Sequence, residues 1–171
     1  MFVERSPLGY KNLRTWQQAG EIFELTEEFV VTLPKRHPKT NQDMMDTADH
    51  MLRSARSLVR NIEEGYKRTT TKEYISFLGY SAGSLEELLG DFNYCNKGDL
   101  GNRSMGNKGE WLCKGEAKML ENQIRSLKDK MMREKTMSAN DLARVELDRR
   151  KREEEKFDKW LLEQSKGNKG D

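Results

Sequence analysis

Residues 48–92 read ADHMLRSARSLVRNIEEGYKRTTTKEYISFLGYSAGSLEELLGDF and have the pattern of two amphipathic helices joined by a very short turn. Apolar residues recur in each half at alternating steps of three and four. They are Met44, Ala48, Met51, Ala55, Leu58 and Ile62 in the first helix, which begins before the quoted stretch, and Ile75, Leu78, Ala82, Leu85, Leu89 and Phe92 in the second. Such steps place each set on one face of a helix and make that face suit a partner helix. The pattern predicts a helical bundle whose function resides on its outer surface.

The turn between these helices carries signals of its own. Gly65 lies near the end of the first helix, where glycine tolerates a left-handed cap. Thr70, followed three residues later by Glu73, forms a capping-box pattern at the start of the second helix. Because the turn is only a few residues long, the two helices are expected to be antiparallel neighbours.

An upstream helix is predicted over about residues 16–33, with Thr15 as its cap. Its apolar stripe shows the same steps and consists of Trp16, Ala19, Phe23, Thr26, Val30 and Leu33. Pro34 ends this helix, because the residue before a proline is pushed out of the α region. Thr40, with Asp43 three residues later, is expected to cap the helix that follows.

The downstream half is predicted to contain a linker and two helices. Residues 96–110 are rich in glycine and are expected to be a mobile linker, because ordering glycine loses much backbone entropy. A fourth helix over about residues 111–132 has an apolar stripe of Ala117, Leu120, Ile124, Leu127 and Met131. Ser138 is expected to start a fifth, highly charged helix. This last helix carries an apolar patch of Phe157, Trp160 and Leu161.

The overall composition limits the classes of protein to consider. The chain has 171 residues, 35% of them hydrophobic and 35% charged, with a net charge of only +2. This length suits one domain and a tail: a flexible lead-in at residues 1–14, a bundle at residues 15–135 and a charged helical extension at residues 136–171. No apolar run approaches the roughly 20 residues of a membrane span. Since Cys95 and Cys113 form no disulfide framework and no signal peptide is recognisable, a cytoplasmic location is expected.

The sequence offers little that points to catalysis. Residues 79–83, GYSAG, match the G-x-S-x-G pattern of serine hydrolases, but no strand precedes them and both His37 and His50 come before the serine. Neither histidine has a partner at metal-ligand spacing. No catalytic residue, metal site or cofactor is therefore predicted, and the protein is interpreted as a non-enzyme. The glycines are interpreted instead as positions where another helix can approach closely, at Gly79, Gly83 and Gly90.

The helix over residues 71–96 carries a second apolar stripe, offset by about 100° from the first. It consists of Tyr74, Phe77, Ser81, Ser84 and Leu88. An apolar arc this wide is more than one core requires, so a homo-oligomer interface is predicted at Tyr74, Phe77, Ser81 and Leu88. The alternative is a helix wedged between two others of its own chain.

Basic residues suggest a site for nucleic-acid phosphates. Arg53, Arg56, Arg60 and Lys67 share one side of the helix before the turn, and Arg68 continues the basic character. Lys35 and Arg36 form a basic corner at the other end of that helix. Such a stripe can bind RNA or DNA phosphates, and oligomerisation would multiply it. The alternative is an ordinary solvated face, because acidic residues interrupt the stripe.

Several segments resemble a known family. Residues 61–68, NIEEGYKR, resemble the N-I-x-E-G-Y-x-R segment of the 23S ribosomal RNA intervening-sequence proteins, also called S23-type proteins. Residues 71–78, TKEYISFL, and residues 82–88, AGSLEEL, are similar to the family's third helix. Similar motifs occur at residues 13–19 and 119–128. The resemblance implies an antiparallel up-down-up-down four-helix bundle that assembles into a ring, usually a homopentamer.

A related branch of that family comprises the accessory variability proteins of diversity-generating retroelements. These form basic pentameric barrels that bind nucleic acid and a reverse transcriptase, and residues 33–37, LPKRH, are similar to their loop after helix one. The resemblance implies a ring-forming, nucleic-acid-binding accessory factor, with RNA, DNA and a reverse transcriptase as expected partners and no membrane association. The alternative is a protein-interaction scaffold without nucleic-acid binding. Two departures from the family are a longer linker and a charged segment after Met137.

Overall fold

The computed structural model describes residue 6, residues 8–136 and residues 139–167, with only the backbone for residues 139, 140, 142 and 160–167. Ser138 therefore lies outside the described residues. The chain divides into two compact units, Met1–Lys128 and Asp129–Asp171, which are described separately. All the regular elements of the described residues are helices, so the predicted all-α class is confirmed. None of these helices combines the length and the apolarity that a membrane span requires.

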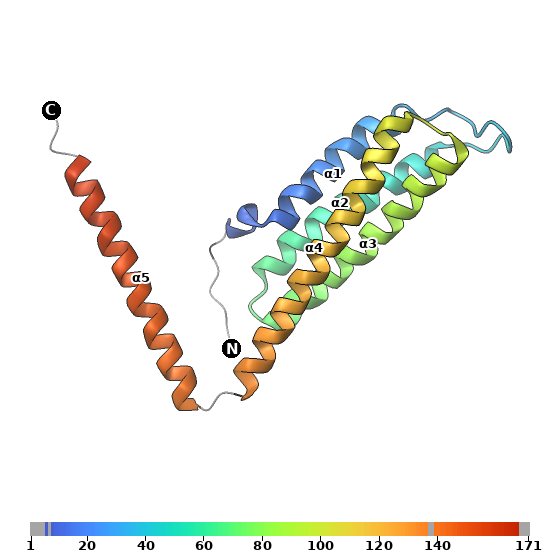
Figure 1. The fold of residues 1–171 in the computed structure, drawn as a ribbon. Coiled ribbons are helices and arrows are strands. Elements are labelled where there is room, and N and C mark those ends of the chain that lie inside the picture. The colour runs from blue at the N-terminus through green and yellow to red at the C-terminus, as the bar shows by residue number, and fades with distance from the viewer. Residues whose placement is uncertain (1–5, 7, 137–138, 168–171) are drawn as a thin grey trace. The chain divides into compact units, whose positions relative to one another are not determined.

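The first unit is a bundle of helices that lie side by side (Figure 1). It contains η1 (Gly9–Asn12), α1 (Arg14–Val30), α2 (Met45–Lys67), α3 (Thr71–Gly98) and most of α4 (Arg103–Thr136). Hydrogen bonds join Leu58 to Ser81 and His50 to Asp91, so α2 and α3 are antiparallel neighbours, as predicted. Thr15 bonds to Gln123 and Glu21 pairs with Lys108, so α1 and α4 also run in opposite directions.

The core fills the space between these helices. Where α1 ends, the core contains the Phe29 and Phe92 rings, whose centroids are 5.2 Å apart. The stripe predicted for α2 is largely confirmed, because Met44, Met51, Ala55, Leu58 and Ile62 are all buried. On α1 the predicted stripe is partly wrong: Ile22 and Phe29 are fully buried, whereas Phe23 and Val30 are only partly buried against the core.

The helix starts show one correct and two wrong cap predictions. Thr70 caps α3, since its Oγ1 accepts a hydrogen bond from the backbone N–H of Glu73 at 3.2 Å. Thr15 lies inside α1 instead of capping it, and its hydroxyl donates to Gln123 Oε1. Thr40 lies well before α2, and at that helix start Asp43 Oδ1 accepts from the backbone N–H of Met45 at 2.9 Å.

The predicted mobile linker at residues 96–110 is wrong. Helix α3 continues to Gly98 and α4 already begins at Arg103, so the connection shrinks to residues 99–102. Gly106 and Gly109 are buried in α4, where a Cβ on Gly109 would lie 2.5 Å from the Phe92 ring. The backbone entropy cost of these glycines is offset because they let α4 pack closely on the core.

The flexible lead-in predicted at residues 1–14 is also wrong in part. Residues 9–12 form the short 3-10 helix η1, and Tyr10 is buried. Its ring makes edge-to-face contacts with Trp16 at 5.4 Å and with Tyr66 at 6.3 Å between centroids. Aromatic packing therefore fixes this segment against α1 and α2.

The second unit contains the end of α4 and α5 (Ala139–Gly167), the charged helix that the sequence predicts. Arg149 Nε lies 3.8 Å from Glu153 Oε1, and Arg150 lies 3.8 Å from Glu146. These exposed pairs contribute little, about 0.5 kcal/mol or less each. Phe157 is exposed, and the side chains of Trp160 and Leu161 lie outside the described residues.

Candidate nucleic-acid interface

The outer face of α2 carries three arginines, Arg53, Arg56 and Arg60, which we call the arginine stripe. At about 100° per residue they fall within one narrow arc of the helix, opposite the buried apolar stripe. All three side chains are exposed, and no hydrogen bond or ion pair to the described residues engages them. No acidic residue occurs on α2 between Asp49 and Glu63. The stripe therefore presents three unpaired guanidinium groups to solvent.

Polar contacts with α3 hold α2 in register beneath this stripe. They are Ser81 Oγ donating to the Leu58 carbonyl (3.2 Å), Ser84 Oγ to Ser57 Oγ (3.0 Å), Ser54 Oγ to Glu87 Oε2 (3.2 Å) and the His50 Nδ1–Asp91 Oδ2 contact (2.6 Å). Burial raises the pKa of Asp91, and the hydrogen bond with His50 counteracts this effect. Because these bonds occur along most of α2, the backbone that carries the arginines is well fixed.

Lys67 and Arg68, also predicted as site residues, are exposed but engaged by neighbouring side chains. Lys67 Nζ lies 5.2 Å from the centroid of the Tyr10 ring. The Arg68 guanidinium lies 4.4 Å from the Phe77 ring and 3.4 Å from the Glu64 carboxylate. Both cations therefore help to fix the end of α2, and they are less free than the arginine stripe to take up a phosphate.

Lys35 and Arg36 belong to a different part of the surface. They lie in the loop between α1 and α2, where they line a pocket together with Ala48. Ala48 lies in the first turn of α2 and Arg60 follows 12 residues later, about 18 Å further along the helix axis, so most of the arginine stripe lies away from this pocket. The structure therefore separates these two residues from the other predicted phosphate-binding residues.

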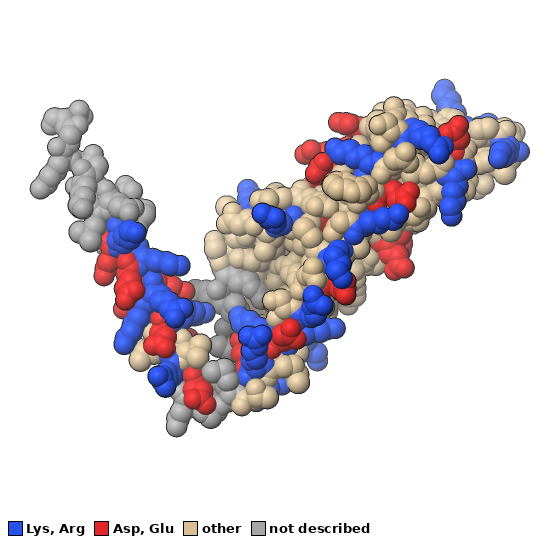
Figure 2. All heavy atoms as spheres, viewed as in Figure 1, with Lys and Arg blue, Asp and Glu red and all other residues tan. Residues whose placement is uncertain are grey.

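Acidic side chains are exposed on both helices that pack against α2. Glu86 and Glu87 are exposed on α3, and Glu24, Glu27 and Glu28 are exposed on α1. Figure 2 shows Lys and Arg interspersed with Asp and Glu over the face that it draws. The exposed arginines of α2 thus form a narrow stripe, which limits the number of phosphates that this helix can contact.

The predicted oligomer stripe on α3 is not a free surface. Tyr74, Ser81 and Leu88 are buried within the chain's own core, at 3%, 0% and 0% exposure. Tyr74 accepts a hydrogen bond from Gln123 of α4, and Ser81 donates to α2. Helix α3 is wedged between two helices of its own chain, which was the alternative interpretation. Phe77 is half-buried, with its ring 5.6 Å from that of Tyr80.

The features associated with catalysis do not assemble into a site. Ser81 of the GYSAG motif lies in the middle of α3 and is fully buried, so it lacks the exposed turn that a hydrolase nucleophile needs. Burial raises the pKa of the Cys95 thiol to about 11 and that of Cys113 to about 12. No group of three or more metal-ligating side chains occurs among the described residues.

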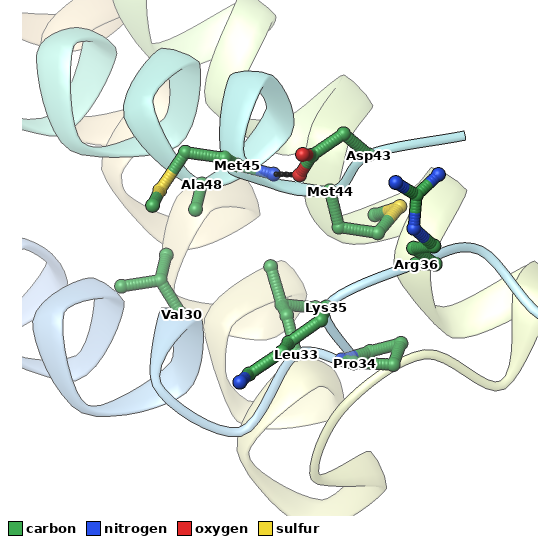
Figure 3. Close-up of a pocket in the computed structure, with 9 residues that line it drawn as sticks. All are labelled: Val30, Leu33, Pro34, Lys35, Arg36, Asp43, Met44, Met45 and Ala48. Carbon is green, nitrogen blue, oxygen red and sulfur yellow. Dashed lines mark hydrogen bonds between the residues drawn. The ribbon is translucent and has the colours of Figure 1, made fainter. Parts of the chain in front are cut away.

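Two further features were not predicted from the sequence. Glu116 of α4 is fully buried, and neither carboxylate oxygen has a hydrogen-bond partner among the described residues. Burial raises its pKa to about 8. A pocket also lies between the end of α1 and the start of α2, formed by the nine residues that Figure 3 labels. The apolar residues Val30, Leu33 and Met44 were all assigned to core stripes, which gave no sign of an open space between them.

The chain matches a known protein family. A family model described as 23S rRNA-intervening sequence protein matches residues 11–122, which is more than half of the chain. This range includes the arginine stripe, Lys67 and Arg68, and it excludes α5. A search of curated proteins gives no match. The relationship to the retroelement accessory proteins stays a prediction.

Proposed function

Because the chain belongs to the family of 23S rRNA-intervening sequence proteins, we propose that it binds RNA along the phosphate backbone without catalysing a reaction. The observation that carries this proposal is the arginine stripe: Arg53, Arg56 and Arg60 are exposed, unpaired among the described residues, and aligned on one rigid helix. Guanidinium groups suit phosphate because their planar donors bind its oxygens in a bidentate manner. Such binding is independent of base sequence.

Three phosphate contacts per chain provide only modest affinity. Each contact to a single strand contributes about 0.7 to the slope of log affinity against log salt concentration, so the expected slope is about 2 for one chain. Binding of this kind weakens steeply as salt rises. Self-association would place several copies of the stripe on one strand and raise the apparent affinity.

We also propose a homo-oligomer, with the interface moved from the predicted stripe to the outer face of α3. Gly79, Gly83 and Gly90 lie on this face, and a Cβ added at any of them would meet nothing within 4 Å. Tyr80 on the same helix is 61% exposed. Each mid-helix glycine costs about 1 kcal/mol relative to alanine, and close approach of another copy would offset that cost. Sedimentation tests this proposal, and a monomer at micromolar concentration contradicts it.

The RNA proposal is tested with a charge-reversal variant of the stripe, Arg53→Glu, Arg56→Glu and Arg60→Glu. Fluorescence anisotropy of a labelled single-stranded RNA at low salt is expected to show at least a roughly tenfold loss of affinity, since three attractive contacts become repulsive. A DNA strand of the same sequence, measured in parallel, shows whether the ribose 2′-hydroxyl contributes.

The matched control reverses three exposed cations on α4, with Lys118→Glu, Arg125→Glu and Lys128→Glu. This variant has the same net charge as the stripe variant and should retain most of the RNA affinity. An equal loss of RNA affinity in both variants would mean that RNA binding depends only on the net charge of the chain. Absence of binding by the unmodified protein at low salt would remove the proposal.

A scaffold that binds other proteins through the C-terminal extension is the second candidate. Val145, Leu147 and Phe157 of α5 are each more than half exposed and give this charged helix apolar groups that a partner could contact. Pull-down with the full chain and with a chain that ends at residue 137 distinguishes the two functions. A partner retained only by the full chain, together with RNA binding by neither, would favour the scaffold.

A further inference from the structure

A pocket of about 430 Å³ opens where α1 ends and α2 begins. Val30 of α1 and Met45 and Ala48 of α2 face one another across it, as Figure 3 shows. Leu33 and Pro34 of the connecting loop complete the apolar lining. We call this space the loop pocket. Its volume lies within the range of about 300–1,000 Å³ that is typical of ligand sites.

Hydrogen bonds hold the loop that forms one wall of the pocket. The backbone N–H of Met44 donates to the Lys35 carbonyl at 3.2 Å, and that of His37 donates to the Gln42 carbonyl at 2.8 Å. Asp43 Oδ1 accepts from the backbone N–H of Met45 and ties the loop to the start of α2. A wall fixed in this way loses little conformational entropy when a ligand binds.

The side chains that line the pocket carry more positive than negative charge. Lys35 and Arg36 are both exposed and belong to the lining. Arg36 Nη1 donates to the Asn41 carbonyl at 2.9 Å, which holds its guanidinium beside Met44 (Figure 3). Asp43 is the single acid among the lining residues, and one of its carboxylate oxygens already accepts the N–H of Met45. The lining therefore offers two cations to a ligand's carboxylates.

The chemistry of the lining argues against the other ligand classes. It contains no aromatic side chain, whereas single-stranded nucleic acids rely on aromatic platforms for base stacking. It contains no side-chain hydroxyl or amide, and its polar side chains, Lys35, Arg36 and Asp43, are all exposed, so it offers few fixed groups to orient a small polar ligand. Aliphatic side chains and the flexible Met44 and Met45 adapt instead to the apolar face of a peptide helix.

We propose that the loop pocket docks an acidic amphipathic helix of a partner protein. Apolar side chains of that helix enter between Val30, Leu33 and Met45, and its carboxylates pair with Lys35 and Arg36. The pocket lies at the start of α2 and the arginine stripe lies further along the helix, so the chain holds a protein and RNA at different positions along α2.

The test uses a fluorescein-labelled helical peptide with leucines at positions i, i+3, i+4 and i+7 and glutamates beside them. The full chain should bind this peptide at least about tenfold more tightly than a version with lysines in place of the glutamates. Lys35→Glu with Arg36→Glu should remove that preference. The matched control, Lys39→Glu with Lys72→Glu, makes the same charge change at exposed lysines outside the lining and should bind normally.

A variant whose side chain fills the pocket provides a second test of the proposal. Ala48→Trp should weaken peptide binding at least about tenfold, because the indole occupies the apolar space. If this variant does not fold, as judged by circular dichroism, Met45→Glu replaces it, since that side chain is 65% exposed and its change leaves the core intact. The stripe variant of Arg53, Arg56 and Arg60 should bind the peptide normally, which separates this result from the RNA result. Equal binding of the two peptides, or full binding by a folded filled-pocket variant, would overturn the proposal.

Discussion

The first half of α4 and the middle of α3 both contain glycine, a residue that helices normally avoid. Two glycines of α4 are buried, whereas those in the middle of α3 are exposed. Gly106 and Gly109 of α4 are buried, and an added Cβ would meet Asn96 or Phe92. Gly79 and Gly83 of α3 are exposed, and an added Cβ would meet nothing within 4 Å. The same residue type therefore serves packing within the chain on α4, whereas on α3 it leaves open a surface that the single chain does not use.

The first half of α4 is unusual in a second respect, because it buries a carboxyl group. Glu116 has no exposed surface and no hydrogen-bond partner among the described residues. Burial of an ionised carboxylate costs far more than burial of the neutral acid, so its pKa rises to about 8. The group is thus neutral in the folded protein at pH values where an unfolded chain would ionise it.

The largest expected effect follows from this carboxyl group and concerns pH. A folded-state pKa above the unfolded value means that the folded protein binds the extra proton, so stability falls as pH rises between the two values. The free energy of unfolding should decrease by about 3 kcal/mol from pH 5 to pH 8. Urea unfolding at a series of pH values measures this slope. Cys113, one turn earlier, adds little slope in this range, because its ordinary pKa of 9.0 and its raised pKa of about 12 both lie above pH 8.

Glu116→Gln isolates the contribution of this one group. The amide cannot ionise, so the variant should lose most of the slope while keeping nearly the same shape. Glu116→Met, which removes the polar group, should also be more stable than the unmodified protein at pH 8. An unmodified protein whose stability is flat from pH 5 to pH 8 would mean that Glu116 finds a partner or solvent in solution.

The second effect tests the close packing of α4. Gly109→Ala places a Cβ 2.5 Å from two atoms of the fully buried Phe92 ring, which has little room to move. Overpacking of this kind costs about 1–3 kcal/mol, which exceeds the gain in helix propensity. Thermal unfolding should therefore show a lower melting temperature for the variant. A melting temperature at or above that of the unmodified protein would show that the ring yields and that close packing does not explain this glycine.

The contrast between the two helices also shows which structural features can be predicted from sequence patterns. The apolar stripe of α2, with Met51, Ala55 and Leu58, was predictable, and so was the Thr70 cap. Helical period and capping depend on local sequence alone. The helical state of residues 103–110 was not predictable, because it depends on how Phe29 and Phe92 from other helices fill the space above the glycines. Local composition indicates the entropy cost of the glycines, but it does not identify the side chains from other helices whose packing offsets that cost.

The candidate site shows the same limit. The exposure of Arg53, Arg56 and Arg60 followed from their position opposite an apolar stripe, and it is confirmed. The position of Lys35 and Arg36 at the other end of α2 was also predicted, but the pocket that they line was not, since it depends on the path of the loop. The interface predicted at Tyr74 is wrong for a related reason. Helical period identifies two apolar faces on α3, but it does not show whether helices of the same chain cover both.

The third effect concerns the inner face of α3. Ser81 Oγ donates to the Leu58 carbonyl at 3.2 Å in the fully buried contact between α2 and α3. Ser81→Ala removes this neutral hydrogen bond, so the free energy of unfolding should fall by about 1 kcal/mol. Urea unfolding of the variant beside the unmodified protein measures the difference. Loss of RNA binding by a stable Ser81→Ala protein would contradict the purely structural role assigned to this serine.

The smallest expected effect has the opposite sign and concerns the outer face of α3. Gly83→Ala adds a Cβ in open space and replaces a poor helix former, so the variant should be about 0.5–1 kcal/mol more stable when the chain is monomeric. If copies of the chain associate through this face, the added methyl group should hinder their approach. Sedimentation over a range of concentrations would then show weaker association, even though dilute samples unfold at a higher urea concentration. A variant that gains stability at every concentration and associates normally would leave the α3 glycines without a packing role, and the interface would have to lie on another helix.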